Sequence, residues 1–322
     1  MTRNLYLGTD LAPIFAAPNQ LALLAAAGTR WAQVQANDFP ARAEAMADEI
    51  ATAEPDLVGL QEGMLYRTDF PPDGPTSAAG TTVIEFVELL KEALARRGLD
   101  YDAVSTFTGT DVEVPAGLPP ALDVRMTDRV VILARGDEST ADLKLSNAQS
   151  STYASAFTVQ TPAGTIRAPR GWASVDVKVR GTSFRFVTTH LEAFSPLVRN
   201  PQAAELLGGP TATDLPVVLV GEMNSGPGFD ISAYGMLLGG GFTDAWIGGD
   251  GLTCCHAVDL SDPSPTLTKR IDLVLTKGGF ETISTDVVGE APADRTASGL
   301  WPSDHAGVVA TLRLPTDGAD RD

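Results

Sequence analysis

Short apolar runs, each next to polar residues of the kinds used in catalysis, restrict the fold of this sequence more than any other feature. The runs are rich in valine, leucine and isoleucine and have the length of β-strands. We expect strands at residues 57–60, 129–134, 172–179, 184–188, 217–220, 271–275 and 306–312. The third and fourth flank a short turn and are expected to form a hairpin.

Amphipathic segments separate these strands and predict helices. The best candidates are residues 41–53, which end before Pro55, and residues 82–97, which place apolar side chains on one helical face. Residues 198–207 and 230–238 are shorter candidates. The sequence therefore predicts a domain in which strands and helices are mixed.

Residues 108–127 fit neither pattern and include three prolines, so we expect a long irregular surface insert, either a lid or a loop that faces the substrate. Composition does not change along the chain in a way that marks a linker. We therefore expect one domain over residues 1–314, followed by a polar tail at residues 315–322. We also expect a monomer.

Composition limits the classes of protein that need to be considered. The 322 residues are 43% hydrophobic and 20% charged, which is typical of a globular chain. No apolar stretch approaches the roughly 20 residues that a membrane-spanning helix needs, so we expect no transmembrane segment. Residues 1–7 read as a strand that begins at once. We favour a removed secretory leader, and thus a secreted protein, with a cytoplasmic location as the alternative.

The formal net charge is −18, from 41 acidic and 23 basic residues. This charge disfavours a protein that binds by neutralising many nucleic-acid phosphates. It does not exclude a phosphate substrate, because a bound cation reverses the local field. The adjacent Cys254 and Cys255 are too few for a four-ligand zinc site. They are interpreted equally well as two buried thiols or as a vicinal disulfide.

Polar residues at the ends of the expected strands are the candidate functional groups. His190, Glu222 and Asn224 follow such strands, and Asp272 and His305 lie where two others begin. Taken singly, each is more often a solvent-facing or structural residue. Taken together, carboxylates, an amide and imidazoles at one sheet edge are what metal-assisted phosphate hydrolysis requires.

The order of six short motifs along the chain resembles the endonuclease/exonuclease/phosphatase superfamily. They are Asn4, Gln61-Glu62, Thr189-His190-Leu191, Gly221-Glu222-Met223-Asn224-Ser225, Arg270-Ile271-Asp272 and Ser303-Asp304-His305. That superfamily includes pancreatic-type deoxyribonuclease, apurinic endonucleases, neutral sphingomyelinases and inositol-polyphosphate 5-phosphatases. The resemblance implies an α/β (α+β) fold in four layers, in which two packed mixed β-sheets are flanked by helices.

The resemblance also implies a metal site and a reaction. Glu62 and Asn4 correspond to the metal-binding positions, and Asp304 is expected to complete the metal shell. The implied cofactor is Mg²⁺, with Mn²⁺ or Ca²⁺ as alternatives. The implied reaction is the in-line attack of water on phosphorus, catalysed by a metal-dependent phosphoesterase.

Four further positions receive roles through the same resemblance. His305 corresponds to the general base that activates water, and Asp272 to the carboxylate that orients it. His190 and Asn224 correspond to donors that stabilise charge on the phosphoryl group. Arg170, Trp172 and Trp301 are candidate substrate-binding residues, although core packing competes with this role for both tryptophans.

Glu222 departs from the family pattern, which has aspartate in the motif Gly-Asp-x-Asn. Glutamate keeps the charge but extends the side chain by one methylene, and about 1 Å of misplacement can lower a rate about 100-fold. The position therefore indicates a natural variant, an engineered change, or a weakened or repurposed enzyme.

Three functions remain open on the sequence. We favour hydrolysis of a small-molecule or lipid phosphoester, either a diester or a monoester. A nuclease of the same superfamily is possible but is disfavoured by the charge. A ligand-binding protein on this scaffold is the alternative from another class.

Overall fold

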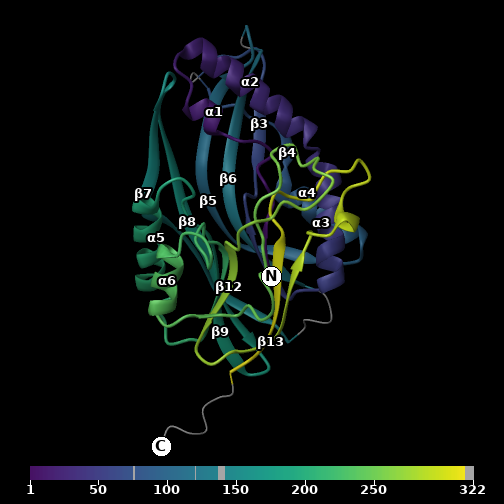
Figure 1. The fold of residues 1–322 in the computed structure, drawn as a ribbon, viewed down its shortest axis with the longest axis vertical. Coiled ribbons are helices and arrows are strands. Elements are labelled where there is room, and N and C mark those ends of the chain that lie inside the picture. The colour runs from purple at the N-terminus through teal and green to yellow at the C-terminus, as the bar shows by residue number, and fades with distance from the viewer. Residues whose placement is uncertain (75–76, 120, 137–141, 316–322) are drawn as a thin grey trace, which may run out of the picture.

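The computed structural model describes residues 1–74, 77–119, 121–136 and 142–315 (Figure 1). Two β-sheets pack face to face, and helices cover their outer faces, which confirms the predicted four-layer fold. Residues 316–322 of the predicted tail lie outside the described residues. No helix in the described ranges is both long and apolar enough to cross a membrane.

The first sheet has eight strands in the described part of the chain. Its spatial order is β13 (Glu281–Val288), β14 (Gly307–Arg313), β1 (Thr2–Asn4), β2 (Leu57–Gln61), β6 (Leu122–Arg135), β3 (Leu65–Asp69) and β4 (Thr81–Glu85), with β5 (Tyr101–Ala116) also paired to β6. Only β1 and β2 run parallel, and all other pairs in this sheet are antiparallel.

The second sheet has six strands within the same described ranges. Their order is β11 (Thr243–Asp244), β12 (Asp272–Lys277), β10 (Val217–Glu222), β9 (Thr182–His190), β8 (Gly164–Val179) and β7 (Lys144–Thr161). Strands β9 and β10 are parallel, and the other pairs are antiparallel. The predicted hairpin over residues 172–188 is the pair β8–β9, which confirms that prediction.

The helices lie outside the two sheets. They are α1 (Ala12–Phe15), α2 (Gln20–Ala36), α3 (Phe39–Ala53), α4 (Phe86–Arg96), α5 (Pro196–Gly208) and α6 (Ser232–Gly239), with a short 3-10 helix at Pro292–Asp294. Helices α3 and α4 pack on the first sheet, and α5 and α6 pack on the second (Figure 1). The helices predicted at residues 41–53, 198–207 and 230–238 are confirmed as α3, α5 and α6.

Three apolar clusters hold the four layers together, one at each interface. Within a central strand, successive side chains enter different clusters: Val58 and Leu60 face the helices, while Leu57 faces the second sheet. Strand β10 behaves in the same way, because Val218 and Val220 face the first sheet. Burial on both faces explains why the predicted strands read as continuous apolar runs rather than as alternating ones.

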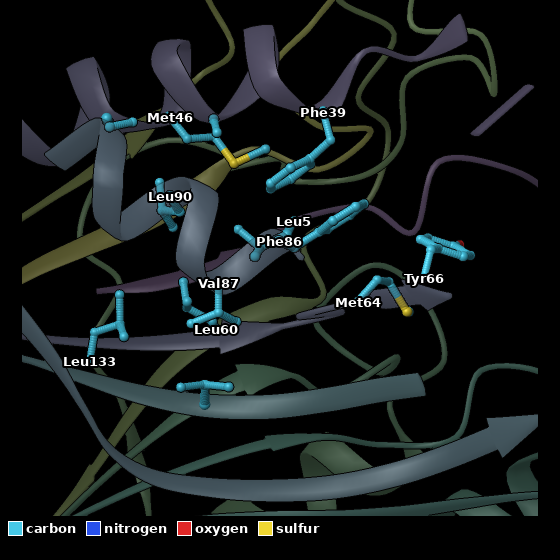
Figure 2. Close-up of a cluster of buried hydrophobic side chains, with 14 of the residues drawn as sticks. Leu5, Phe39, Met46, Leu60, Met64, Tyr66, Phe86, Val87, Leu90 and Leu133 are labelled. Atoms are coloured by element: carbon cyan, nitrogen blue, oxygen red, sulfur yellow. The ribbon is translucent and has the colours of Figure 1, made fainter. Parts of the chain in front are cut away.

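The cluster between the first sheet and its helices is rich in aromatic side chains (Figure 2). Phe39 of α3 and Phe86 of α4 stack with ring centroids 3.5 Å apart, and Tyr66 of β3 lies beside them at 6.0 Å from Phe86. Met46 and Leu90 fill the space between the two helices (Figure 2). This contact fixes α3 and α4 against the first sheet, which contains β1 and β2.

The prediction of an irregular insert at residues 108–127 is wrong. Most of this segment belongs to β5 and β6, which form a long antiparallel pair with a turn near Gly117. Pro115 is tolerated because β5 pairs with β6 alone, and an unpaired strand edge needs no donor. The helix predicted at residues 82–97 is also too long, since 81–85 form β4 and α4 begins at Phe86.

The two sheets approach each other closely at Gly59 of β2. A β-carbon there would lie 2.5 Å from Thr188 Oγ1 of β9 and 2.5 Å from a methyl carbon of Val220 of β10. Such distances are far shorter than normal contacts. Glycine at this position therefore sets the separation of the sheets beside the site described below.

We expect Gly59→Ala to lower the free energy of unfolding by about 1–3 kcal/mol, because the added methyl group overpacks the space between the sheets. Urea denaturation measures this change. The control is Gly235→Ala in α6, where a β-carbon meets no atom within 4 Å and alanine favours the helix. Equal stability of the Gly59→Ala variant and the wild type would contradict the close approach.

Candidate functional site

Six strands bring the candidate residues to one place. Parallel strands β1 and β2 both end at this edge of the first sheet, and β14 begins there because it runs antiparallel to β1. Strands β9 and β10 end at the same edge of the second sheet, and antiparallel β12 begins there. The predicted convergence at one edge is therefore correct, and the two sheets contribute jointly.

Asp272 and His305 form a buried pair at this edge. The Asp272 Oδ2 atom lies 2.7 Å from His305 Nδ1, and both residues are at most 5% exposed. An aspartate at Nδ1 fixes the ring orientation and leaves Nε2 facing the site. Burial opposes protonation of His305, but the carboxylates of Asp272, Glu222 and Asp304 outweigh it and raise the pKa of His305 well above its ordinary value.

Glu222 lies at the centre of the site. Its Oε2 atom accepts a hydrogen bond from Asn4 Nδ2 at 2.6 Å and lies 3.1 Å from His190 Nε2. Its Oε1 atom lies 3.7 Å from His305 Nε2. The hydrogen bond between Asn4 and Glu222 joins β1 to β10, and thus one sheet to the other. The longer side chain is therefore part of a connected network rather than a misfit.

His190 is held between a cation and a carboxylate. Arg170 Nη1 lies 3.0 Å from His190 Nδ1, and because a guanidinium only donates, Nδ1 must accept. The proton of the neutral ring is then on Nε2, where it is donated to Glu222. Burial first, and then the charges of Arg170 and His305, lower the pKa of His190 well below its ordinary value. His190 is therefore a neutral donor.

The remaining predicted ligands surround this centre. Glu62 has a positive φ of 55° at the end of β2, and its Oε2 atom accepts from Leu7 N at 2.5 Å. Asn224 also has a positive φ, and its Nδ2 donates to Leu191 O at 2.9 Å. Burial raises the pKa of the Asp304 carboxylate. The nearby charge of His305 lowers this pKa, and the charge of Glu62 raises it.

A sequence model of the Endonuclease/Exonuclease/phosphatase family matches residues 29–305. The chain belongs to this family. The members are phosphoester hydrolases that generally use a divalent metal, which makes this chain a hydrolase of the same family. A search of curated proteins finds no match.

Solved structures share the fold at low sequence identity. A family protein from Bacteroides thetaiotaomicron is 16% identical with a TM-score of 0.60, and the match covers 92% of this chain and 93% of that one. A mannosyl-6-phosphatase from the same organism is 18% identical, with coverages of 89% and 95% and a TM-score of 0.55. D. rerio TDP2 complexed with single-strand DNA product is 17% identical, with coverages of 85% and 92% and a TM-score of 0.55.

The residues at the site fit the divalent cation that family members generally use. Burial is the main cause that raises the pKa of Glu62, Glu222 and Asp304 to about 7 in each case, and neighbouring carboxylates add to it. Asp272 Oδ1 is buried without a hydrogen-bond partner. Crowded carboxylate oxygens of this kind match the hard, oxygen-preferring cations.

Three compact groups of candidate ligand atoms occur at this edge in the described part of the chain, and two of them contain carboxylates, while the third joins His305 to the two cysteines. Glu222 belongs to both carboxylate groups: one contains Glu62 and His190, and the other contains Asp272 and His305. All ligand atoms in each group lie within 4.8 Å of one another. Asp304 belongs to none of these groups, so its part in a metal shell remains a prediction.

The structure contradicts a substrate-stacking role for Trp301 and Trp172. Trp301 is fully buried, stacks on His256 with centroids 4.1 Å apart, and donates from Nε1 to Asp262 O. Trp172 packs against the apolar cluster under α5 and α6, on the outer face of its sheet. Trp301 is therefore a core residue, and Trp172 is partly buried against the core.

Cys254 and Cys255 are joined as a vicinal disulfide in the structure, one of the two alternatives left open by the sequence. Cys254 makes an isolated β-bridge with His305. Cys255 Sγ lies 4.0 Å from His305 Nε2. The pair therefore borders the site rather than lying on a remote surface.

Sequence reasoning missed Asp128 and Glu192. Asp128 Oδ2 accepts from Arg170 Nη1 at 2.6 Å, so Asp128 orients the side chain that holds His190. Glu192 is 1% exposed and follows the end of β9. The signal for Asp128 was present but weak, since it is an acidic residue just before an apolar run instead of after one.

We expect stabilisation by Mg²⁺ to increase with pH. The folded-state pKa of Glu62, Glu222 and Asp304 is about 7, above the ordinary values of 4.5 and 3.8, so the folded state retains protons that the unfolded state loses. Without a cation, stability therefore falls as pH rises from about 4 to about 7. Cation binding requires the deprotonated carboxylates, so it is favoured above this range.

Thermal unfolding with Mg²⁺ and with EDTA, at about pH 5.5 and about pH 8.5, measures this difference. The increase in Tm caused by Mg²⁺ should be larger at the higher pH and should be lost in Glu62→Gln. An increase that is equal at both values, or larger in acid, would contradict the assignment of these carboxylates to the cation.

Proposed function

We propose that this protein is a divalent-metal-dependent phosphoesterase that hydrolyses a phosphodiester or phosphomonoester other than nucleic acid. The observation that carries the proposal is the buried row from Asp272 through His305 to Glu222, with distances of 2.7 and 3.7 Å. In this row a positioned imidazole lies between two acidic groups, at the sheet edge where the strands end. These are the components of a base and a cation site for attack by water.

His305 acts as the general base in this proposal. Asp272 holds its Nδ1, which leaves Nε2 directed into the site to take a proton from water. Its raised pKa favours the protonated ring as long as the carboxylates are uncompensated. A bound Mg²⁺ would polarise the phosphoryl oxygens and, as a positive charge among these carboxylates, lower the pKa of His305 towards neutrality.

His190, Arg170 and Asn224 stabilise the phosphoryl group. His190 is a neutral donor in a fixed orientation, and Arg170 supplies a positive charge from the same place. The second hydrogen of Asn224 Nδ2 remains available after its bond to Leu191 O. Fixed donors aimed at developing charge are an effective form of catalysis because no reorganisation is needed.

Glu62 and Asn4 are the proposed cation ligands, with Asp304 beside them. Glu62 is fixed by its bond from Leu7 N, and Asn4 is fixed by accepting from Tyr6 N at 2.6 Å. Asn4 and Glu62 lie where the parallel strands β1 and β2 end, which brings them to the same edge of the sheet. These backbone contacts hold the oxygen atoms in position before any cation binds.

The net charge of −18 supports a substrate other than nucleic acid, because a long polyanion would be repelled except at the cation. The structures with a similar fold span both alternatives, since one is a mannosyl-6-phosphatase and another contains a single-strand DNA product. The nuclease therefore stays the second candidate within the family.

The contacts of Glu222 favour an enzyme over a repurposed binding protein. Its carboxylate bonds Asn4 and His190 at once and reaches towards His305. The surrounding side chains are thus arranged for glutamate, and the departure from the family pattern is accommodated.

We expect His305→Ala to lower kcat by about 10²–10⁴-fold, the range of a lost general base. Release of p-nitrophenol from bis(p-nitrophenyl) phosphate in Mg²⁺ measures it. Asp272→Asn should act in the same direction because it removes the group that orients the ring. The control Asp286→Asn changes an exposed aspartate on β13 and should leave kcat unchanged. Full activity of His305→Ala would rule out this base.

We expect Glu222→Gln to lose about 100-fold or more in kcat/KM, and Glu222→Asp to lose less, because aspartate keeps the charge but retracts it by a methylene. The same assay with a panel of diesters, monoesters and single-stranded DNA separates the substrate classes. An increase in activity in Glu222→Asp would show that glutamate weakens the site and would support the repurposed scaffold.

A further inference from the structure

An apolar cavity adjoins the candidate site. Its volume is about 110 Å³, and it lies between α1 and α2 on one side and β3, β5, β6 and β8 on the other. Trp31 of α2, Val112 and Val114 of β5, and Ala168 of β8 line it. Figure 1 shows these elements together at the end of the molecule that carries α1 and α2.

The charged residues that line the cavity connect it to the site. Glu62, Asp128 and Arg170 are among them. Arg170 contacts His190 at 3.0 Å, and Glu62 belongs to the same ligand group as His190 and Glu222. A molecule held by Arg170 at its polar end therefore has an apolar space directly beside it.

Three phenylalanine rings close the outer side of the cavity. Phe15 of α1, Phe157 of β7 and Phe194 after β9 have centroid distances of 5.3–6.2 Å to one another. Phe194 is 57% exposed, although it lines the cavity, so the space reaches solvent at this ring. An exposed aromatic ring at the mouth of an apolar pocket is typical of a binding site rather than of a packing defect.

We propose that this cavity binds an unbranched alkyl or acyl chain attached to the phosphoester substrate, with the phosphoryl group beside Arg170. The inference rests on the proposed phosphoesterase activity and specifies its substrate class. An engineered cavity of about 150 Å³ holds one benzene molecule, so the present volume of about 110 Å³ accepts about four carbon atoms. It is too small for two chains or for a folded peptide.

The residues that line the cavity come from different parts of the sequence. Val112 and Val114 lie in the segment predicted as an irregular surface insert, but they belong to strand β5 and line the cavity on the side opposite α2. Leu11 and Phe15 lie before residue 29, where the match to the family begins. The cavity therefore combines family strands with a segment that the family match does not include.

The test compares n-alkyl p-nitrophenyl phosphates, which share one leaving group and differ only in the chain. From methyl to butyl, we expect kcat/KM to rise roughly two- to fourfold for each methylene, and then to level off towards hexyl because the cavity is filled. Substrates are kept below the concentrations at which they form micelles. Equal kcat/KM for methyl and hexyl esters would overturn the proposal.

Filling the cavity should remove the gain that a longer chain gives over the methyl ester. Ala168→Phe and, as a second variant, Val114→Phe place a ring in the space, while Ala163→Phe in the exposed β7–β8 turn is the matched control. We expect the hexyl-to-methyl ratio to fall to about one in the first two variants and to stay at the wild-type value in the control. An unchanged ratio in a folded filled variant would overturn the proposal.

A binding measurement separates failure of the cavity from failure of the enzyme. The probe is 4-bromobutylphosphonate, whose bromine should quench Trp31 fluorescence when the chain enters. Quenching should persist in His305→Ala and Trp172→Phe and be lost in Trp31→Phe and Ala168→Phe. Quenching with no turnover of any ester would refute the proposed function alone, whereas no quenching by Trp31 would refute the cavity assignment.

Discussion

The close contact between the two sheets at Gly59 determines where every functional side chain lies. Thr188 and Val220 meet Gly59 directly, and Gln61 Nε2 donates to Thr188 Oγ1 at 3.0 Å just before the site. From this contact the strand ends diverge very little, so β1 and β10 remain close enough for Asn4 to bond Glu222. The site is therefore a product of sheet packing as much as of the residues that it contains.

Several buried acidic side chains gather at this edge, and a contribution to the stability of the fold does not explain why. The carboxylates of Glu62, Glu222, Asp272 and Asp304 gather near His305, and burial raises the pKa of Glu62, Glu222 and Asp304 to about 7. Elsewhere in the core, the buried Arg3 is paired with Glu49 at 2.8 Å. The concentration of unmatched acid at one edge is typical of a functional site, where charges are placed for a ligand.

Local patterns in the sequence predicted most of the strands and the meeting of the candidate residues at one edge, whereas the four-layer arrangement was implied by the family resemblance. Val217–Val220 reads as a strand whatever its partners are, and Glu222 and His305 follow from their positions at strand ends. Trp301 shows the limit: its neighbours in sequence belong to the site, but its ring lies against His256, and only the tertiary structure gives that contact. Asp128 was missed for a related reason, since its role comes through Arg170, which is 42 residues away.

Helix α1 contacts mainly α2 and β7 and supports neither the central strands nor the residues at the sheet edge. Its Phe15 ring nevertheless closes the apolar cavity. The residues proposed to cleave the ester and the α1 ring that lines the cavity therefore lie in separate parts of the chain. Exchange of this one short segment between relatives would change which substrates fit, while the machinery that breaks the ester bond stays the same.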